Sequence, residues 1–100
     1  MPEKIWGTVV SKFLVIWSLK SKYASKEGVS SILSMPDYAK RLKQSGKLDQ
    51  RYHIPGKHGG AWIYNVETNE ELDRLLAMAP VYNYAKYKVY PLAEMPPTQD

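Results

Sequence analysis

The sequence predicts an α+β fold whose elements follow the order β-α-β-β-α-β. Three observations indicate this order. Two segments, residues 12–20 and 61–66, are nearly continuous in apolar residues, as in strands at the centre of a sheet. A helical segment separates them, and a glycine-rich turn precedes the second. A helix-capping motif and an apolar stripe with helical spacing then come before a last alternating strand.

The first strand and the helical segment after it are predicted at residues 12–20 and 29–45. The strand, KFLVIWSLK, is rich in β-branched and aromatic residues, which is typical of a strand buried on both faces. Pro36 does not fit a helix interior and disfavours helical geometry at the residue before it. We therefore expect a short helix from Val29 to Leu33, a break, and a second helix that begins at Pro36. Gly46 is suited to end that helix.

Two strands joined by a turn are predicted next, at residues 48–54 and 61–66. The turn, PGKHGG at 55–60, is typical of a hairpin. The second strand is mostly apolar and is expected at the centre of the sheet. The first contains Asp49 and Arg51 and is expected at an edge.

The second helix has the clearest local signal in the sequence. TNEE at 68–71 is a capping box, in which the threonine hydroxyl and the last glutamate satisfy each other's free backbone N–H groups. An apolar stripe with helical spacing follows, formed by Leu72, Leu75, Leu76 and Ala79. Pro80 ends this helix. The alternating segment at 84–92 predicts a final strand at an edge.

This order is that of the ferredoxin-like fold, which places both helices on one face of an antiparallel sheet. The first and third strands of that fold lie in the middle, and they are the two most apolar strands here. Because the helices cover only one face, the other face is expected to carry large apolar side chains. The candidates are Leu14, Ile16, Trp62 and Tyr64. A large exposed apolar patch usually marks an interface.

The chain has 100 residues, the size of one small domain. We expect one domain over residues 1–100. Residues 1–11 show no clear period and are expected to form a loose leader or an added short strand. The polar, proline-containing segment 93–100 is expected to be a tail.

Composition argues against several classes of function. The net charge is +4, but no run of basic residues exceeds two, so we expect no nucleic-acid binding. The charge is compatible with a modest attraction for an anionic small molecule. The chain has no cysteine and only two histidines, His53 and His58, so we expect no metal site. No apolar run is long enough to span a bilayer, so we expect no membrane association and a cytoplasmic protein.

Four segments in the second half of the chain resemble the muconolactone isomerase family. They are QSGK at 44–47, IYNVETNEEL at 63–72, LLAMAPVYNY at 75–84, and the pattern K-x-x-V-x-P-L from Lys86 to Leu92. The resemblance implies a subunit whose sheet pairs face to face with a second copy in a dimeric α+β barrel, often within a larger homo-oligomer. It also implies a small-molecule pocket between the sheet and the helices.

The resemblance further implies a cofactor-free isomerase that acts by proton transfer on a small unsaturated lactone or a similar oxygenated compound. Gly56, Gly59 and Gly60 are not followed by a helix that would hold a cofactor phosphate. Two alternatives stay open. One is a cyclase-type relative, and the other is a non-catalytic small-molecule-binding or oligomeric scaffold protein of the same fold.

The resemblance places the family's catalytic glutamate at Met35, and methionine cannot accept a proton. Either the break at Pro36 brings Asp37 or Tyr38 into the pocket, or another group serves, or the isomerase chemistry is absent. His53 is a candidate because imidazole exchanges protons near neutral pH.

The candidate catalytic residues are therefore His53, Asp37 and Tyr38. Each also has a purely structural interpretation. His53 could be an exposed histidine of an edge strand, Asp37 could interact with the helix dipole, and Tyr38 could be a core residue. The candidate substrate-binding residues are aromatic or basic, namely Trp62, Tyr64, Tyr52, Arg51 and Lys20.

Overall fold

The computed structural model describes residues 4–5, 8–9, 11–23, 26–93 and 95. In these residues a four-stranded antiparallel sheet has the strand order β4-β5-β3-β6. Its strands are β3 (Ser11–Leu19), β4 (Leu48–His53), β5 (Gly59–Val66) and β6 (Ala85–Leu92). The predicted order of elements is confirmed, with the two most apolar strands at the centre and the other two at the edges.

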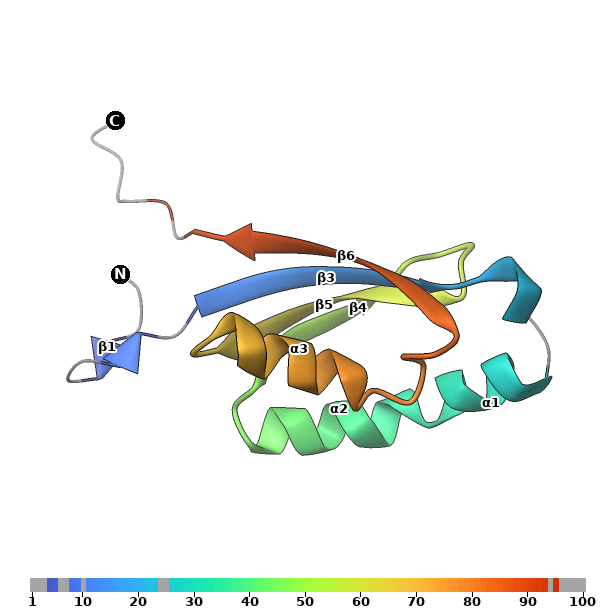
Figure 1. Cartoon of the computed structure of the whole chain (residues 1–100), viewed down its shortest axis with the longest axis horizontal. Coiled ribbons are helices and arrows are strands. Elements are labelled where there is room, and N and C mark those ends of the chain that lie inside the picture. Colours follow the sequence, from blue (N-terminus) through green and yellow to red (C-terminus); the bar gives the residue numbers. More distant parts are fainter. Residues whose placement is uncertain (1–3, 6–7, 10, 24–25, 94, 96–100) are drawn as a thin grey trace.

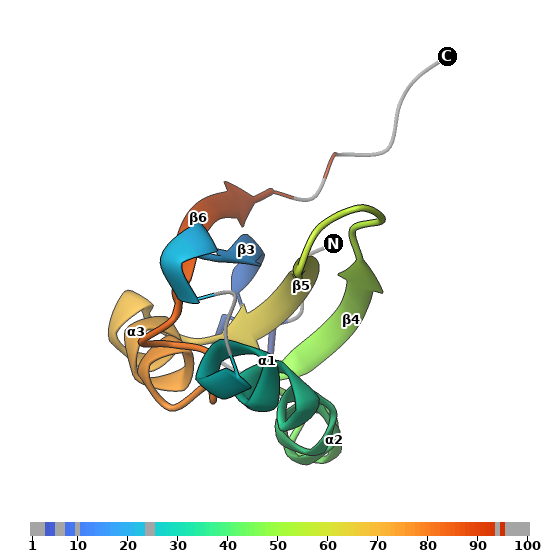
Figure 2. The same cartoon turned by 90° about the vertical axis from the view of Figure 1, so that its right-hand side faces the viewer.

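All three α-helices lie on one face of this sheet (Figure 1). They are α1 (Lys26–Leu33), α2 (Met35–Gln44) and α3 (Asn69–Ala77), and a short 3-10 helix, η1 (Ser21–Tyr23), precedes α1. None of the helices in the described ranges is long and apolar enough to cross a membrane. No helix among the described residues lies over the opposite face of the sheet (Figures 1 and 2).

The expected leader contains a small strand pair, β1 (Lys4–Ile5) with β2 (Thr8–Val9), which is separate from the main sheet. The rest of the expected leader up to residue 10 lies outside the described residues. So does most of the expected tail, namely residues 94 and 96–100.

The predicted break in the helical segment falls at Ser34, between α1 and α2. Pro36 is the second residue of α2, where a missing backbone N–H breaks no hydrogen bond. The helix ends in a Schellman motif: Gly46 N–H donates to the Lys43 carbonyl (3.1 Å) and Lys47 N–H to the Leu42 carbonyl (2.9 Å). Gly46 has a φ of 77°, which favours glycine.

The hydrophobic core lies between the sheet and the helices. Val15 and Trp17 of β3 face the helices, and the register pairs Val15 with Trp62 and Phe13 with Tyr64. Trp62 and Tyr64 are buried in this core. Their assignment to the uncovered face is therefore wrong, because the register turns the alternate residues of β5 toward that face.

The uncovered face carries the remaining apolar residues of the strands. Leu14 pairs with Ile63 and with Tyr90, and Ile16 pairs with Ala61. Tyr90 is 45% exposed. An apolar, uncovered sheet face is thus present as predicted, although only Leu14 and Ile16 of the four expected residues belong to it.

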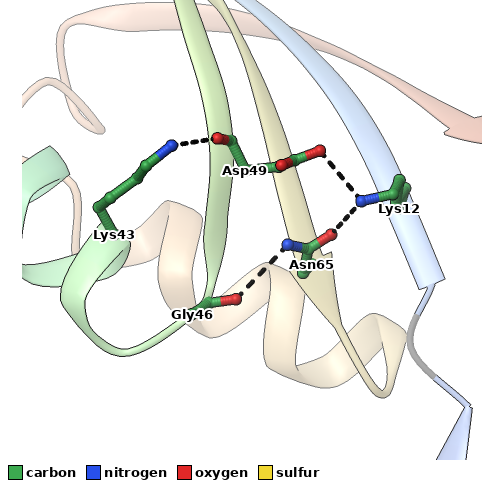
Figure 3. Close-up of polar contacts among 5 residues, drawn as sticks. All are labelled: Lys12, Lys43, Gly46, Asp49 and Asn65. Atoms are coloured by element: carbon green, nitrogen blue, oxygen red, sulfur yellow. Dashed lines mark hydrogen bonds and ion pairs between the residues drawn. The ribbon is translucent and has the colours of Figure 1, made fainter. Parts of the chain in front are cut away.

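A polar network closes one end of the uncovered face (Figure 3). Lys12 Nζ donates to Asp49 Oδ2 (3.0 Å) and to Asn65 Oδ1 (2.9 Å), so that β3, β4 and β5 are joined. Asn65 Nδ2 lies 3.5 Å from the Gly46 carbonyl, and Lys43 Nζ donates to the Asp49 carbonyl. The network lies beside the register shift between Leu48 and Gln50 and holds this irregular part of β4 on the sheet.

Candidate functional site

A pocket of about 430 Å³ lies between the β4–β5 hairpin and the junction of α1 with α2, the region that faces the viewer in Figure 2. Its volume is in the range of small-molecule sites. It is lined by Trp17, Ile32, Met35, Pro36, Arg51, Tyr52, His53, Lys57, His58, Gly59, Gly60 and Trp62.

The hairpin that forms one wall begins with a tight turn. Pro55 and Gly56 are its central residues, Gly56 has a φ of 83°, and Lys57 N–H donates to the Ile54 carbonyl (3.2 Å). These are the features of a type II turn. The loop is fixed to β3 by a bond of 2.8 Å from Leu19 N–H to the His58 carbonyl. The two histidines of the chain therefore line the pocket on a well-anchored hairpin.

Two tryptophans converge on Gly60 inside the pocket. A Cβ atom on Gly60 would lie 3.3 Å from Trp62 Nε1, 3.4 Å from Trp17 Nε1 and 2.7 Å from the Tyr52 carbonyl oxygen. The two indole rings are edge-to-face, with centroids 6.5 Å apart and planes at 80°. A side chain at this position would therefore clash with the Tyr52 carbonyl and press on both indole rings.

Trp17 Nε1 is a buried donor without an acceptor. The side chain of Trp17 is 6% exposed, and no atom of the described residues accepts a hydrogen bond from its N–H. A buried, unsatisfied N–H costs about 1–3 kcal/mol, which makes it unusual in a folded core.

The pocket lining is cationic. Arg51 and Lys57 line it together with His53 and His58, and no aspartate or glutamate of the described ranges belongs to the lining. The Arg51 guanidinium carbon lies 5.9 Å from the centroid of the Trp62 ring, a cation–π arrangement between two residues of the pocket lining. The electrostatics therefore favour an anionic or oxygen-rich ligand.

Four of the eight predicted site residues line the pocket, namely His53, Arg51, Tyr52 and Trp62. Asp37 and Lys20 do not: both are exposed, one on the first turn of α2 and the other after the end of β3. The break at Pro36 does not turn Asp37 into the pocket, because Asp37 lies on the solvent side of α2.

Tyr38 and Tyr64 are core residues outside the pocket lining. The Tyr38 hydroxyl donates to the Leu75 carbonyl, and burial raises its pKa. Burial also raises the pKa of Tyr64, which stacks on Trp62 with centroids 6.1 Å apart. A hydroxyl that is bonded to backbone or withdrawn into the core is poorly placed to protonate a ligand.

The sequence reasoning missed several lining residues, above all Trp17, Lys57 and Ile32. Trp17 could have been predicted to face the helices, because it follows Val15 by two positions and therefore lies on the same side of β3. Met35 is 3% exposed and lines the pocket. The resemblance to the isomerase family had placed the family's glutamate at that position.

No group of three or more His, Cys, Asp or Glu side chains is close enough to hold a metal ion in the described part of the chain. The pocket instead offers imidazole, guanidinium and indole groups around an apolar wall. This set of groups suits proton transfer and the binding of oxygen anions.

Comparisons with known proteins agree on one family. Residues 12–98 match the family model described as Muconolactone delta-isomerase. A stretch of 59 residues is 37% identical to the Muconolactone Delta-isomerase of Cupriavidus pinatubonensis and covers 59% of this chain and 64% of that protein. The corresponding protein of Acinetobacter baylyi is 36% identical over 59 residues, which is 62% of its length. The matched stretch thus spans less than two thirds of these relatives.

The structural comparison supports the same fold. A crystal structure of muconolactone isomerase superposes with a TM-score of 0.73 at 20% identity, over 89% of this chain and 95% of the other. A conserved protein of unknown function from Bacteroides thetaiotaomicron, described as a possible oxidoreductase, superposes with a TM-score of 0.53 at 7% identity. At these identities, the likeness concerns the fold alone.

Proposed function

Because the chain belongs to the muconolactone delta-isomerase family, we propose that it is a cofactor-free isomerase that transfers a proton within a small unsaturated lactone or a similar oxygenated compound. The observation behind this proposal is the pocket at the β4–β5 hairpin. It combines a ligand-sized volume, two imidazoles and a cationic lining.

His53 is the proposed base. It ends β4 and pairs with Gly60 of β5, so its backbone is held by the sheet, whereas His58 lies in the loop. Functional groups on strands are positioned more accurately than groups on loops. Met35 in the pocket wall cannot take this role, and Asp37 lies outside the lining.

The proposed reaction uses the groups around His53 as follows. The imidazole removes a proton from the saturated carbon next to the ligand's conjugated C=C–C=O unit, and negative charge develops on the carbonyl oxygen. Arg51 stabilises that charge, since donors placed where charge develops lower the barrier. The protonated imidazole then returns the proton to another carbon, which moves the double bond.

The first prediction concerns this proton transfer. The protein is incubated in D₂O with muconolactone and close analogues, and deuterium uptake and double-bond movement are followed by NMR. We expect His53→Gln to lower the rate by about 10²–10⁴-fold, the usual contribution of a general base. Asp37→Asn is the control and is expected to leave the rate unchanged.

Three outcomes would contradict parts of this proposal. Full activity of His53→Gln would remove His53 from the mechanism, and a large loss in Asp37→Asn would restore Asp37. Binding of the ligand without deuterium uptake would favour the second candidate function, a non-catalytic small-molecule-binding protein. Met35, which lines the pocket, favours this second candidate, because the resemblance implies the family's catalytic glutamate at that position and methionine cannot accept a proton.

We also propose that the protein assembles as a homodimer or a larger homo-oligomer. The uncovered sheet face supports this proposal, because Leu14, Ile16 and Ile63 lie at its centre and Tyr90 at its edge. Two copies that pair through this face would bury the apolar residues of both.

A further inference from the structure

A second pocket, of about 350 Å³, lies where the β4–β5 hairpin meets the end of β3 and the start of β6. These three segments share one end of the sheet (Figure 1). Ser18 follows the core-facing Trp17, and Lys86 pairs with Ser18, so both belong to the uncovered side of the sheet. The second pocket is therefore distinct from the candidate pocket described above, whose lining includes neither residue. Its polar lining residues are Ser18, Ser21, Lys57, His58 and Lys86.

The lining of the second pocket is positively charged. Lys57 and Lys86 bring two ammonium groups and His58 brings an imidazole, and all three side chains are exposed. No aspartate or glutamate of the described ranges belongs to the lining, and neither lysine takes part in an ion pair between described residues. Like charges that share a cavity repel one another, and a bound anion removes that repulsion.

Two serine hydroxyls add neutral hydrogen-bond donors to the second pocket. Ser18 lies near the end of β3 and Ser21 in η1, and neither hydroxyl makes a hydrogen bond within the part of the chain that the structure describes. A hydroxyl group can rotate toward an incoming acceptor. Lysine binds phosphate as a point charge, and hydroxyl donors then fix the oxygens. Ammonium and hydroxyl groups without a carboxylate therefore favour a phosphate ligand.

The backbone around the second pocket is fixed by contacts within the chain. Leu19 N–H donates to the His58 carbonyl and Lys20 N–H to the Tyr84 carbonyl, both at 2.8 Å. A Cβ on Gly59 would clash with the backbone of β3, so the hairpin packs against this strand with no space for a side chain. A ligand therefore has to order only the exposed side chains, which lowers the entropic cost of binding.

We propose that the second pocket is a binding site for a phosphate dianion, either free or as the monoester of a small organic molecule. Lys57 and Lys86 neutralise its charge, and the hydroxyls of Ser18 and Ser21 donate to its oxygens. A phosphate group offers three or more strong acceptor oxygens to donors that come from three separate segments. The inference goes beyond the proposed isomerase function and does not depend on it.

Inorganic phosphate and glycerol 3-phosphate are the probes for this site. The ³¹P NMR linewidth of each is followed at pH 8 as protein is added, at an ionic strength of about 0.15 M, where charges more than about 8 Å apart are largely screened. We expect the protein to broaden both signals. Tighter binding of glycerol 3-phosphate would assign the site to phosphate esters, and equal or tighter binding of inorganic phosphate would assign it to the free ion.

Three variants locate the site. Lys86→Gln removes a cation that lines the second pocket and not the candidate pocket, and we expect phosphate binding to weaken about tenfold or more, since hydrogen bonds to charged groups are strong. Arg51→Gln is the matched control, because it removes one cation of the candidate pocket and is expected to leave phosphate binding unchanged. Ser18→Ala keeps the charge, removes one hydroxyl and is expected to weaken binding about tenfold.

Failure of the parent protein to broaden either signal would reject the site. Equal losses in Lys86→Gln and Arg51→Gln would also reject it, because net charge alone would then attract phosphate. A larger loss in Arg51→Gln would place the anion in the candidate pocket instead. Light scattering checks that each variant keeps the mass of the parent protein. If Lys86→Gln changes that mass, Ser18→Ala decides, and full phosphate binding by this variant would overturn the proposal.

Discussion

Glu71 joins three parts of the structure through one carboxylate. Its Oε2 lies 2.7 Å from Lys47 Nζ, just before β4, and its Oε1 accepts from Glu67 N–H at 2.8 Å. Its own N–H donates to Thr68 Oγ1 at 3.0 Å, as a capping box requires. The expected reciprocal bond to Thr68 N–H is wrong in detail, because the carboxylate reaches Glu67, one residue earlier. The start of α3 is thus tied to the start of β4.

The second prediction is a pH-dependent contribution of Glu71 to stability. The hydrogen bond from Lys47, together with that from Glu67 N–H, lowers the pKa of the Glu71 carboxyl in the folded protein. A lowered folded-state pKa gives stability that is complete above the unfolded-state value, about 4.3, and is lost as pH falls through the folded-state pKa. We expect Glu71→Gln to lower the free energy of unfolding by about 1 kcal/mol at pH 7.

Urea unfolding at pH 7 and at pH 3 measures this difference. The difference in the free energy of unfolding between Glu71→Gln and the parent protein is expected to be smaller at pH 3 than at pH 7. Glu70→Gln changes the exposed neighbouring carboxylate and is the control. An equal difference in the free energy of unfolding at both pH values would show that ionisation of Glu71 does not contribute to stability.

The end of α2 determines where β4 begins. Gly46 adopts a φ of 77°, and the two hydrogen bonds of the Schellman motif depend on that backbone geometry. A Cβ on Gly46 would meet no atom within 4 Å. The cost of a side chain at this position is therefore conformational and not steric.

The third prediction tests this element boundary. Gly46→Ala is expected to lower the free energy of unfolding by about 1–2 kcal/mol, the cost of left-handed geometry for an L-residue. Gly46→Asn is expected to cost less, because asparagine tolerates this conformation. Chemical denaturation of the three proteins makes the comparison. An alanine variant as stable as the parent would mean that α2 can end without a left-handed residue at position 46.

The whole molecule has one covered and one uncovered sheet face (Figure 1). Exposed apolar side chains of the uncovered face include Tyr90 at 45% and Leu92 at 40%, beside the central Ile16 and Ile63. Full burial of a large apolar side chain contributes about 1.5–3 kcal/mol, which is a large share of the stability of a small domain. Pairing of two such faces would supply that burial.

The fourth prediction is the oligomeric state. Light scattering at micromolar concentration is expected to give a mass of at least twice the 11.5 kDa of one chain. Ile63→Lys, at the centre of the uncovered face, is expected to shift the mass to that of one chain. Leu33→Lys is the control, since Leu33 is exposed on the helical side. A monomeric parent protein, or an equal effect of both variants, would contradict pairing through this face.

The sequence by itself determined the order of the main elements, although α1 begins at Lys26, before the expected start at Val29. Residues within a few positions of one another encode the break just before Pro36, the glycine that ends α2, the turn at 55–60 and the cap of α3. The choice of central strands also followed from composition, because a strand buried on both faces needs apolar residues at nearly every position.

Only the tertiary structure decided which face of each central strand meets the helices. From Ala61 to Tyr64, β5 is apolar on both faces, and the one polar side chain on its outer side, Asn65, lies near the end of the strand. A shift of one residue in register exchanges the two faces. The pairing of Trp17 with Gly60 joins positions far apart in the sequence and brings both indoles together. Met35 and His58 reach the same pocket from a helix and a loop. Such a site depends on long-range packing, and no local pattern in the chain records it.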